Sequence, residues 1–292
     1  MAIAIAVVLA AFVANAAEWS DTYIGFRTGH QYKETGNVNP IQKYILTFDH
    51  VSGYSYGQNW FGVDLLKSNS KDPSNLASPG NSDGAQEAYI CYRHNLKLSK
   101  VFRHSLSFGP INDIMFTAGG DYNTKNTTFA PSTRKIFAGP TLSIRVPGYL
   151  NLGVLYDQEW NHNAFGGFAA QNGGAVNVTY KPTYMVSASW GIPVAIGPVN
   201  TTAKGFANYT GKKGQDGSGV QSMPETLVRA YWMLDAGSFV GARKGAWMIG
   251  PGWELWDNKF GVPAFEPGVP RPQFTQVNPR TNTFVMAVEA HF

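Results

Sequence analysis

Hydrophobic and polar residues alternate with a period of two along most of this 292-residue chain. The C-terminal segment 281–292 gives the clearest example. One side of that segment carries Phe284, Met286, Val288, Ala290 and Phe292, and the residues between them are Val285, Ala287, Glu289 and His291. This period is typical of a β-strand with two chemically different faces, because successive side chains in a strand point to opposite sides.

Polar breaks rich in Gly, Asn, Pro and Ser divide the chain into twelve such segments, and no amphipathic helix of useful length is predicted. The segments lie near 19–28, 42–50, 56–66, 85–94, 111–122, 134–144, 149–160, 175–190, 200–210, 225–235, 246–257 and 281–292. Their lengths are close to the roughly 9–11 residues that a tilted strand needs to cross a bilayer.

The breaks between these segments alternate between long and short, with "NLKLSKVFRHSLSFGP" at 95–110 as an intermediate exception. "TGHQYKETGNVNP" at 28–40 is long, whereas "VSGY" at 51–54, "RVPG" at 145–148 and "PVAIGP" at 193–198 are short. An even number of strands with this alternation is typical of bacterial outer-membrane barrels. The pattern therefore predicts one all-β domain over residues 17–292, a transmembrane antiparallel up-and-down β-barrel of about 12 strands.

Charged residues within the segments fall on the side opposite the aliphatic residues. In 42–50, Tyr44, Leu46 and Phe48 alternate with Lys43 and Asp49. A Lys or Arg facing lipid at the bilayer midplane costs roughly 2–4 kcal/mol, so we expect the charged side to face the lumen. A soluble β-sandwich also alternates, but its core would not accept so many charges and its strands are shorter.

Composition agrees with a barrel wall and narrows the class of partner. Charged residues make up 14% of the chain, aromatic residues another 14%, and mean hydropathy is −0.19; soluble proteins carry roughly 25% charged residues. The net charge of +4 is small and unclustered, so there is no electrostatic footprint for nucleic acid. Cys91 is the only cysteine, which excludes an intramolecular disulfide, and we interpret it as a small strand residue.

The N-terminal residues predict export. The apolar run 1–16 ends in Ala14, Asn15 and Ala16, a small-residue cleavage pattern, although no Lys or Arg precedes its apolar part. We interpret it as a secretory signal peptide; an N-terminal membrane anchor is the alternative, but the run is shorter than the about 20 residues of a spanning helix.

The expected location is the bacterial outer membrane, with both termini periplasmic and with membrane lipid and lipopolysaccharide around the barrel. Phe292, at the end of the last predicted strand, resembles the signal that the barrel assembly machinery recognises.

Several stretches resemble one known family. They include "WSDTYIGFRTG" at 19–29, "GAQEAYICYRHNL" at 84–96, "LSFGPINDIMFTAGGDYNTKN" at 106–126 and "FAGPTLSI" at 137–144. Together they are similar to the Tsx-type nucleoside-specific channels of bacterial outer membranes and their OmpK-like relatives, over nearly all of the chain after residue 16. The resemblance implies a twelve-stranded barrel through which nucleosides diffuse by way of weak internal sites.

The residues on the predicted inner side offer the chemistry of such a channel. A nucleoside has a flat base, which stacks on aromatic rings for roughly 1–3 kcal/mol, and a sugar whose hydroxyls bind charged groups. The candidate lumen residues are Tyr23, Arg27, Lys43, Asp49, Trp60, Asp64, Glu87, Tyr89, Arg93, Asp113, Phe137, Asp157, Glu159, Lys181, Arg229, Tyr231, Glu254 and Trp256. Transport requires several weak sites, because a tight site traps its cargo. For any single charge among them, an ion pair or hydrogen bond that fills or braces the lumen is the favoured interpretation, whereas the passage of polar aromatic solutes better explains the set as a whole.

The motifs point to no enzyme, metal or cofactor. The six histidines form no close metal-binding pair. An outer-membrane phospholipase-like enzyme is an alternative, with His162 near the outer rim, but no serine stands beside it, and His50 and Ser52 fall at a predicted short turn.

A structural or adhesive barrel with a closed lumen is a further alternative. A role for the long breaks as a phage or colicin receptor is compatible with a channel.

Overall fold

The computed structural model describes residues 17–34, 37, 39–74, 83–127, 132–162, 177–217, 219–262 and 280–292. The interpreted signal peptide at 1–16 lies outside them. The strands are β1 (Trp19–Tyr32), β2 (Ile41–Tyr54), β3 (Gly57–Ser68), β4 (Gln86–Lys97), β5 (Ile111–Lys125), β6 (Ser132–Ile144), β7 (Tyr149–His162), β8 (Asn177–Thr179), β9 (Thr183–Ile196), β10 (Val199–Thr210), β11 (Glu225–Asp235), β12 (Trp247–Asp257) and β13 (Thr281–His291). Short helical segments are α1 (Leu98–Phe102), η1 (Gly237–Val240) and η2 (Lys259–Gly261).

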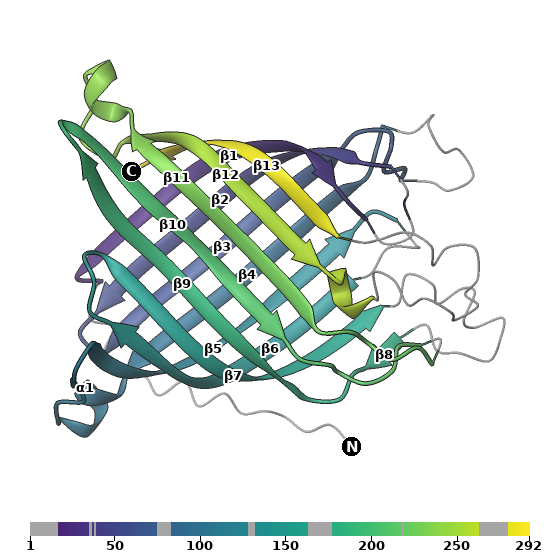
Figure 1. Cartoon of the computed structure of the whole chain (residues 1–292), viewed down its shortest axis with the longest axis horizontal. Coiled ribbons are helices and arrows are strands. Elements are labelled where there is room, and N and C mark those ends of the chain that lie inside the picture. The colour runs from purple at the N-terminus through teal and green to yellow at the C-terminus, as the bar shows by residue number, and fades with distance from the viewer. Residues whose placement is uncertain are drawn as a thin grey trace.

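The strands form one closed antiparallel sheet (Figure 1). β1 pairs with β13 from Tyr23↔His291 to Gly29↔Val285, which closes the ring. β7 pairs with β6 and β9, and its end also pairs with the three-residue β8. The ring therefore contains twelve strands, and β8 only lengthens one ladder. The predicted antiparallel barrel and its strand number are confirmed.

The connections differ between the two ends of the barrel (Figure 1). At one end, residues 55–56 join β2 to β3, residues 145–148 join β6 to β7, and residues 197–198 join β9 to β10. We call this the short-turn end, although two of its connections are longer and contain α1 and η1. The opposite end is the long-loop end.

Two of the predicted short turns are wrong in position. Segments 51–54 and 193–196 belong to β2 and β9, so the hairpins are tighter than the sequence suggested. His50 and Ser52 therefore lie within a strand and not at a turn. Ser, Gly and Pro signal turns locally, but strand preference depends on context, and the pairing of the closed ladder overrides the local signal.

None of the helical segments in the described part of the chain is long and apolar enough to span a membrane.

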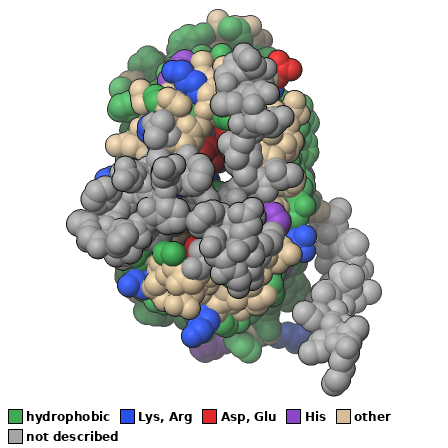
Figure 2. Space-filling view, turned by 90° about the vertical axis from the view of Figure 1, so that its right-hand side faces the viewer, with side chains coloured by type: hydrophobic (Ala, Val, Ile, Leu, Met, Phe, Trp, Pro, Cys, Tyr) green, Lys and Arg blue, Asp and Glu red, His purple; other side chains and the backbone are tan. Residues whose placement is uncertain are grey.

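The outer surface of the barrel wall is apolar. Phe26, Leu65, Val154, Val186 and Met286, from five different strands, are each 43–57% exposed, whereas their neighbours in the same strands are buried or half-buried. Hydrophobic side chains likewise follow the outline of the molecule in Figure 2. The predicted separation of aliphatic and charged faces is confirmed, with the aliphatic face outside.

The inner surface is mixed. Small apolar clusters pack against it, such as Phe137 with Leu155 and Met185, but many of the buried inner side chains are polar or charged. A soluble β-sandwich has the reverse arrangement, with an apolar core between its sheets. The barrel therefore positions polar chemistry inside.

Candidate functional site in the barrel lumen

The inward-facing residues of the twelve ring strands make up the candidate site. Every strand residue predicted for the lumen alternates with outward-facing neighbours and lies on the inner side. Lys181 is the exception: it is exposed and lies between β8 and β9, outside any strand. The strand alternation from which it was predicted does not extend to it, because Pro182 follows it and proline lacks the N–H that a continuous strand would need there.

Five side chains near mid-height form a connected group, the central ion cluster: Arg27, Thr47, Asp64, Arg229 and Glu254. Arg27 donates from Nη1 to Asp64 Oδ1 at 2.9 Å and from Nη2 to Asp64 Oδ2 at 2.6 Å. Thr47 Oγ1 donates to Asp64 Oδ1 at 2.7 Å. Arg229 donates from Nη1 to Asp64 Oδ2 at 3.2 Å and from Nε to Glu254 Oε2 at 2.9 Å.

The central ion cluster crosses the lumen. Asp64 lies on β3 and Arg229 on β11, and β2, β1, β13 and β12 stand between those strands in the ring. Two guanidiniums face two carboxylates, so the cluster has no net charge. This balance is required because a buried charge without a partner costs several kcal/mol, roughly 3–5 when one partner is removed.

A second feature of the lumen is the contact of arginine with aromatic rings. The Arg93 guanidinium carbon lies 4.0 Å from the centre of the Phe137 ring and 5.8 Å from that of Trp60. Asp121 holds this guanidinium, with Arg93 Nη1 donating to its Oδ1 at 2.6 Å. Planar guanidinium groups stack on aromatic faces. The predicted Trp60, Arg93 and Phe137 are therefore brought together as one stack.

Six charged side chains at the long-loop end form the outer ion cluster: Glu34, Lys43, Asp72, Glu87, Lys125 and Lys259. Lys43 Nζ donates to Glu34 Oε1 at 2.5 Å, Lys259 Nζ donates to the same oxygen at 2.8 Å, and Lys125 Nζ lies 3.7 Å from Glu34 Oε2. Lys43 also donates to Glu87 at 3.1 Å, and Lys125 lies 2.8 Å from Asp72. All six side chains are at most 8% exposed.

Glu34 is the centre of this cluster and lies just beyond β1. Burial raises the pKa of a carboxyl, but the three neighbouring ammonium groups hold the pKa of Glu34 well below its usual value. The carboxylate therefore stays ionised and serves as a shared counter-ion for three lysines from separate elements.

The remaining predicted lumen residues mostly contact the wall or its loops. Tyr231 packs against two of the inner apolar clusters. Polar contacts join Tyr23 to Asp49, Ser99 Oγ to Asp113 at 2.5 Å, Lys213 Nζ to Glu159 at 2.5 Å, Lys135 Nζ to Asp157 at 3.8 Å, and Trp256 Nε1 to Glu225 at 2.5 Å. Because these side chains already bind partners within the chain, their contacts fit a role in bracing the wall.

Sequence reasoning missed two kinds of lumen residue. Asp121 and Lys125 share the inward phase of β5 with the predicted Asp113, so extending the alternation would have found them. Glu34, Asp72 and Lys259 lie outside the strands. No period marks a loop residue as inward-facing, and these three carried no usable signal.

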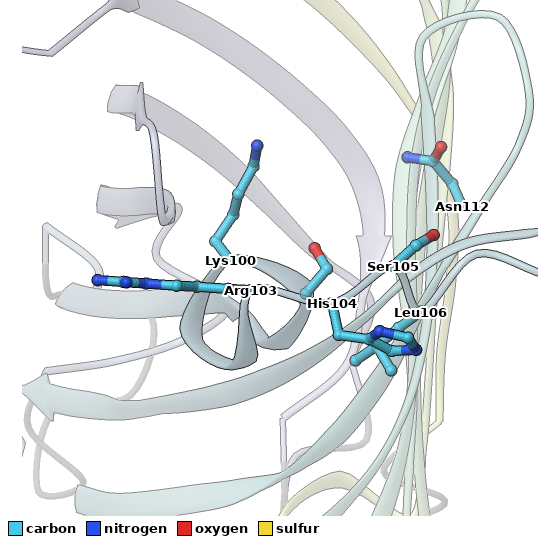
Figure 3. A pocket seen from close by; sticks show the side chains of 7 residues that line it. Lys100, Arg103, His104, Ser105, Leu106 and Asn112 are labelled. Carbon is cyan, nitrogen blue, oxygen red and sulfur yellow. The ribbon is translucent and has the colours of Figure 1, made fainter.

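A shallow open pocket at the short-turn end is lined by Ser99, Lys100, Arg103, His104, Ser105, Leu106 and Asn112. Figure 3 shows the ends of Lys100 and Arg103 pointing in different directions, both away from His104 and Leu106. Because its polar groups do not converge, this pocket is a weaker candidate than the lumen. Among the described residues, no group of three or more His, Cys, Asp or Glu side chains could hold a metal ion.

His162, the candidate of the enzyme alternative, lies at the end of β7. Its Nδ1 is 3.1 Å from Asn177 Oδ1. Ser132 stands opposite it in the β6–β7 register, which the sequence alone did not suggest. The Ser132 hydroxyl donates instead to the backbone oxygen of Asn123 at 2.8 Å, so its proton is directed away from the imidazole.

Comparison with known proteins finds no match to a family model and none to a curated protein sequence. Among solved structures, the translocator domain of the autotransporter NalP from Neisseria meningitidis is 12% identical, covering 96% of this chain and 90% of that one, with a TM-score of 0.45. The beta domain of the Bordetella autotransporter Brka is 9% identical, covering 95% and 100%, with a TM-score of 0.37. The outer membrane protein opdK from Pseudomonas aeruginosa is 8% identical, covering 94% and 99%, with a TM-score of 0.24. At these identities and TM-scores, the likeness supports no conclusion about this chain.

Proposed function

We propose that this protein is a channel of the bacterial outer membrane through which small, neutral, polar aromatic solutes such as nucleosides diffuse passively. The observation that carries the proposal is the lumen itself, in which compensated charges stand beside aromatic rings. The resemblance of segments such as 106–126 to Tsx-type channels supports nucleosides as the solute class.

The outer surface supports a location in a bilayer. A hydrocarbon core accepts a sheet only when all backbone groups are paired, which a closed barrel achieves. The ring strands have 11–15 residues, enough to cross a bilayer at a tilt. The apolar outward side chains would then contact lipid, and the polar inner wall would contact water.

The central ion cluster and the arginine stack favour an uncharged solute with a flat ring. The side chains of Arg93 and Arg229 are each 19% exposed, so part of each guanidinium is accessible from the lumen. A base stacks on such a plane, while carboxylates and the remaining N–H groups bind sugar hydroxyls. Because the charges of the central ion cluster compensate one another, neither a cation nor an anion finds an unpaired partner within that cluster.

Buried polar atoms support a hydrated lumen. Both carboxylate oxygens of Asp157, Asp49 Oδ1 and Asn161 Oδ1 lack a hydrogen-bond partner within the chain. Buried polar groups are nearly always satisfied, and an aqueous passage would supply what the protein does not.

Uptake into liposomes that contain the purified protein tests the proposal. Radiolabelled uridine should enter faster than ribose, which lacks the base, and faster than uridine monophosphate, which carries charge. Uridine uptake no faster than in empty liposomes would refute the channel. Equal rates for all three solutes would refute the preference for neutral aromatic solutes.

Replacing Trp60 and Tyr89 together by alanine should reduce the preference for uridine over ribose, because both rings lie on the inner side. Trp253→Ala is the matched control, since Trp253 bonds Asn282 on the outward side and is not part of the lumen. An unchanged preference in the double variant would show that Trp60 and Tyr89 do not contribute to the solute site.

A structural barrel with a closed lumen is the second candidate. The buried outer ion cluster favours it, because salt bridges at one mouth obstruct passage. The same uptake experiment separates the two functions, since a closed barrel that is correctly folded should admit no solute.

A further inference from the structure

The segment η2, which follows β12 at the long-loop end, has an unusual backbone. Asn258 and Phe260 have positive φ values of 47° and 59°, and Gly261 has a φ of 75°. Residues other than glycine rarely adopt this region. Such a conformation persists only where the surroundings enforce it, so the contacts of η2 identify what holds it.

Those contacts fix η2 at the inner side of the mouth. Lys259, Phe260 and Gly261 are all buried. The Phe260 backbone N–H donates to Glu225 Oε1 at 3.1 Å, and the Met223 N–H donates to the Gly261 oxygen at 2.9 Å. The segment is thus attached to β11 and to the chain just before it.

Lys259 extends the attachment across the mouth. Its Nζ lies 4.5 Å from the centre of the Trp256 ring and donates to Glu34 Oε1 at 2.8 Å. Glu34 in turn reaches Lys125 at 3.7 Å. Lys125 is on β5, which lies six strand positions from β12 in the ring of twelve. The chain of contacts from η2 through Glu34 to Lys125 therefore joins opposite walls.

From this geometry we infer that η2 is the outer constriction of the channel and that the Lys259–Glu34 ion pair is the latch that holds it across the mouth. The inference rests on the proposed function and adds to it the residues that determine which solutes enter. Phe260 and the Lys259 side chain occupy space that a solute must pass, so the latch sets the upper size limit. A solute would reach the central ion cluster only after it had passed the latch.

Lys259→Met and Glu34→Gln test the inference in planar bilayers and liposomes. Each should raise single-channel conductance at least twofold and admit a trisaccharide that the unaltered protein excludes. Lys259→Arg keeps the charge and should behave like the unaltered protein. Lys212→Met removes an exposed lysine at the same end of the barrel and is the matched control. Heat-modifiable mobility on gels confirms that each variant is folded.

The outcomes separate this inference from the proposed function. If the unaltered protein passes uridine but Lys259→Met shows the same conductance and size limit, the latch is refuted and the channel remains. If no folded variant conducts, both fail. If only the latch variants conduct, the latch is supported and the unaltered barrel is closed.

Discussion

Among single residues, Asp64 holds the central ion cluster together because two arginines share its carboxylate. Its two oxygens accept from Arg27 at 2.6 and 2.9 Å and from Arg229 at 3.2 Å. Arg229 also binds Glu254. Arg27 is only 5% exposed, so water compensates little of its charge. The charge of Asp64 therefore decides both the stability of the central ion cluster and the electrostatic potential at mid-lumen.

Replacing Asp64 by asparagine should leave a net positive charge at mid-lumen while keeping the shape of the side chain. We expect the channel to become anion-selective and the barrel to lose stability, by about 3–5 kcal/mol where a buried pair is broken by removing one partner. The reversal potential under a salt gradient measures the first effect. Glu18→Gln removes the same charge at an exposed position and should leave the potential unchanged; equal values for both variants would contradict the prediction.

At the level of elements, β5 shows how the wall makes room for the arginine stack. A Cβ atom at Gly119 would lie 2.2 Å from the Tyr92 backbone oxygen on β4 and 2.7 Å from the Phe137 ring on β6. Neither strand can retreat without disturbing its ladder. The glycine therefore allows β4, β5 and β6 to approach closely enough for Arg93 to cover Phe137.

Gly119→Ala should displace Phe137 and destabilise the barrel by about 1–3 kcal/mol, the usual cost of overpacking. Gly153→Ala is the matched control on the same inner wall, because its new Cβ would meet the Thr141 hydroxyl at 2.7 Å and otherwise mainly a movable Leu155 methyl. The midpoint of urea unfolding in detergent measures the stability of each variant. A larger loss for the Gly153 variant would show that the wall at Gly119 can relax.

Alternation predicted the elements and the inner side of each strand, because a barrel wall has only two faces and the sequence labels both. Arg27, Asp64, Arg229 and Glu254 were therefore predicted as lumen residues. Their meeting in one cluster was not predictable, since it depends on which strands lie across the ring from one another. Glu34 and Lys259 were missed for a different reason: loop residues have no period, and their inward position follows only from three-dimensional contacts.

For the whole molecule, the central claim is that this barrel faces lipid outside and water inside. Val186 and Ser187 are neighbours in β9 and test it directly. Val186 is 46% exposed on the outer surface, whereas Ser187 lies on the inner side and donates to Asn208 at 2.7 Å. The two positions differ in the face they present but share the same strand and nearly the same height.

Val186→Arg should destabilise the barrel in a lipid bilayer, because a basic side chain that faces lipid costs roughly 2–4 kcal/mol at the midplane and less toward the interfaces. Ser187→Arg should cost less, because its guanidinium can extend into a hydrated lumen that already holds Arg93 and Arg229. Reversible denaturant unfolding in phospholipid vesicles measures both values. A larger loss of stability for Ser187→Arg than for Val186→Arg would place water outside the barrel and an apolar core inside. That result would refute both the channel and its latch.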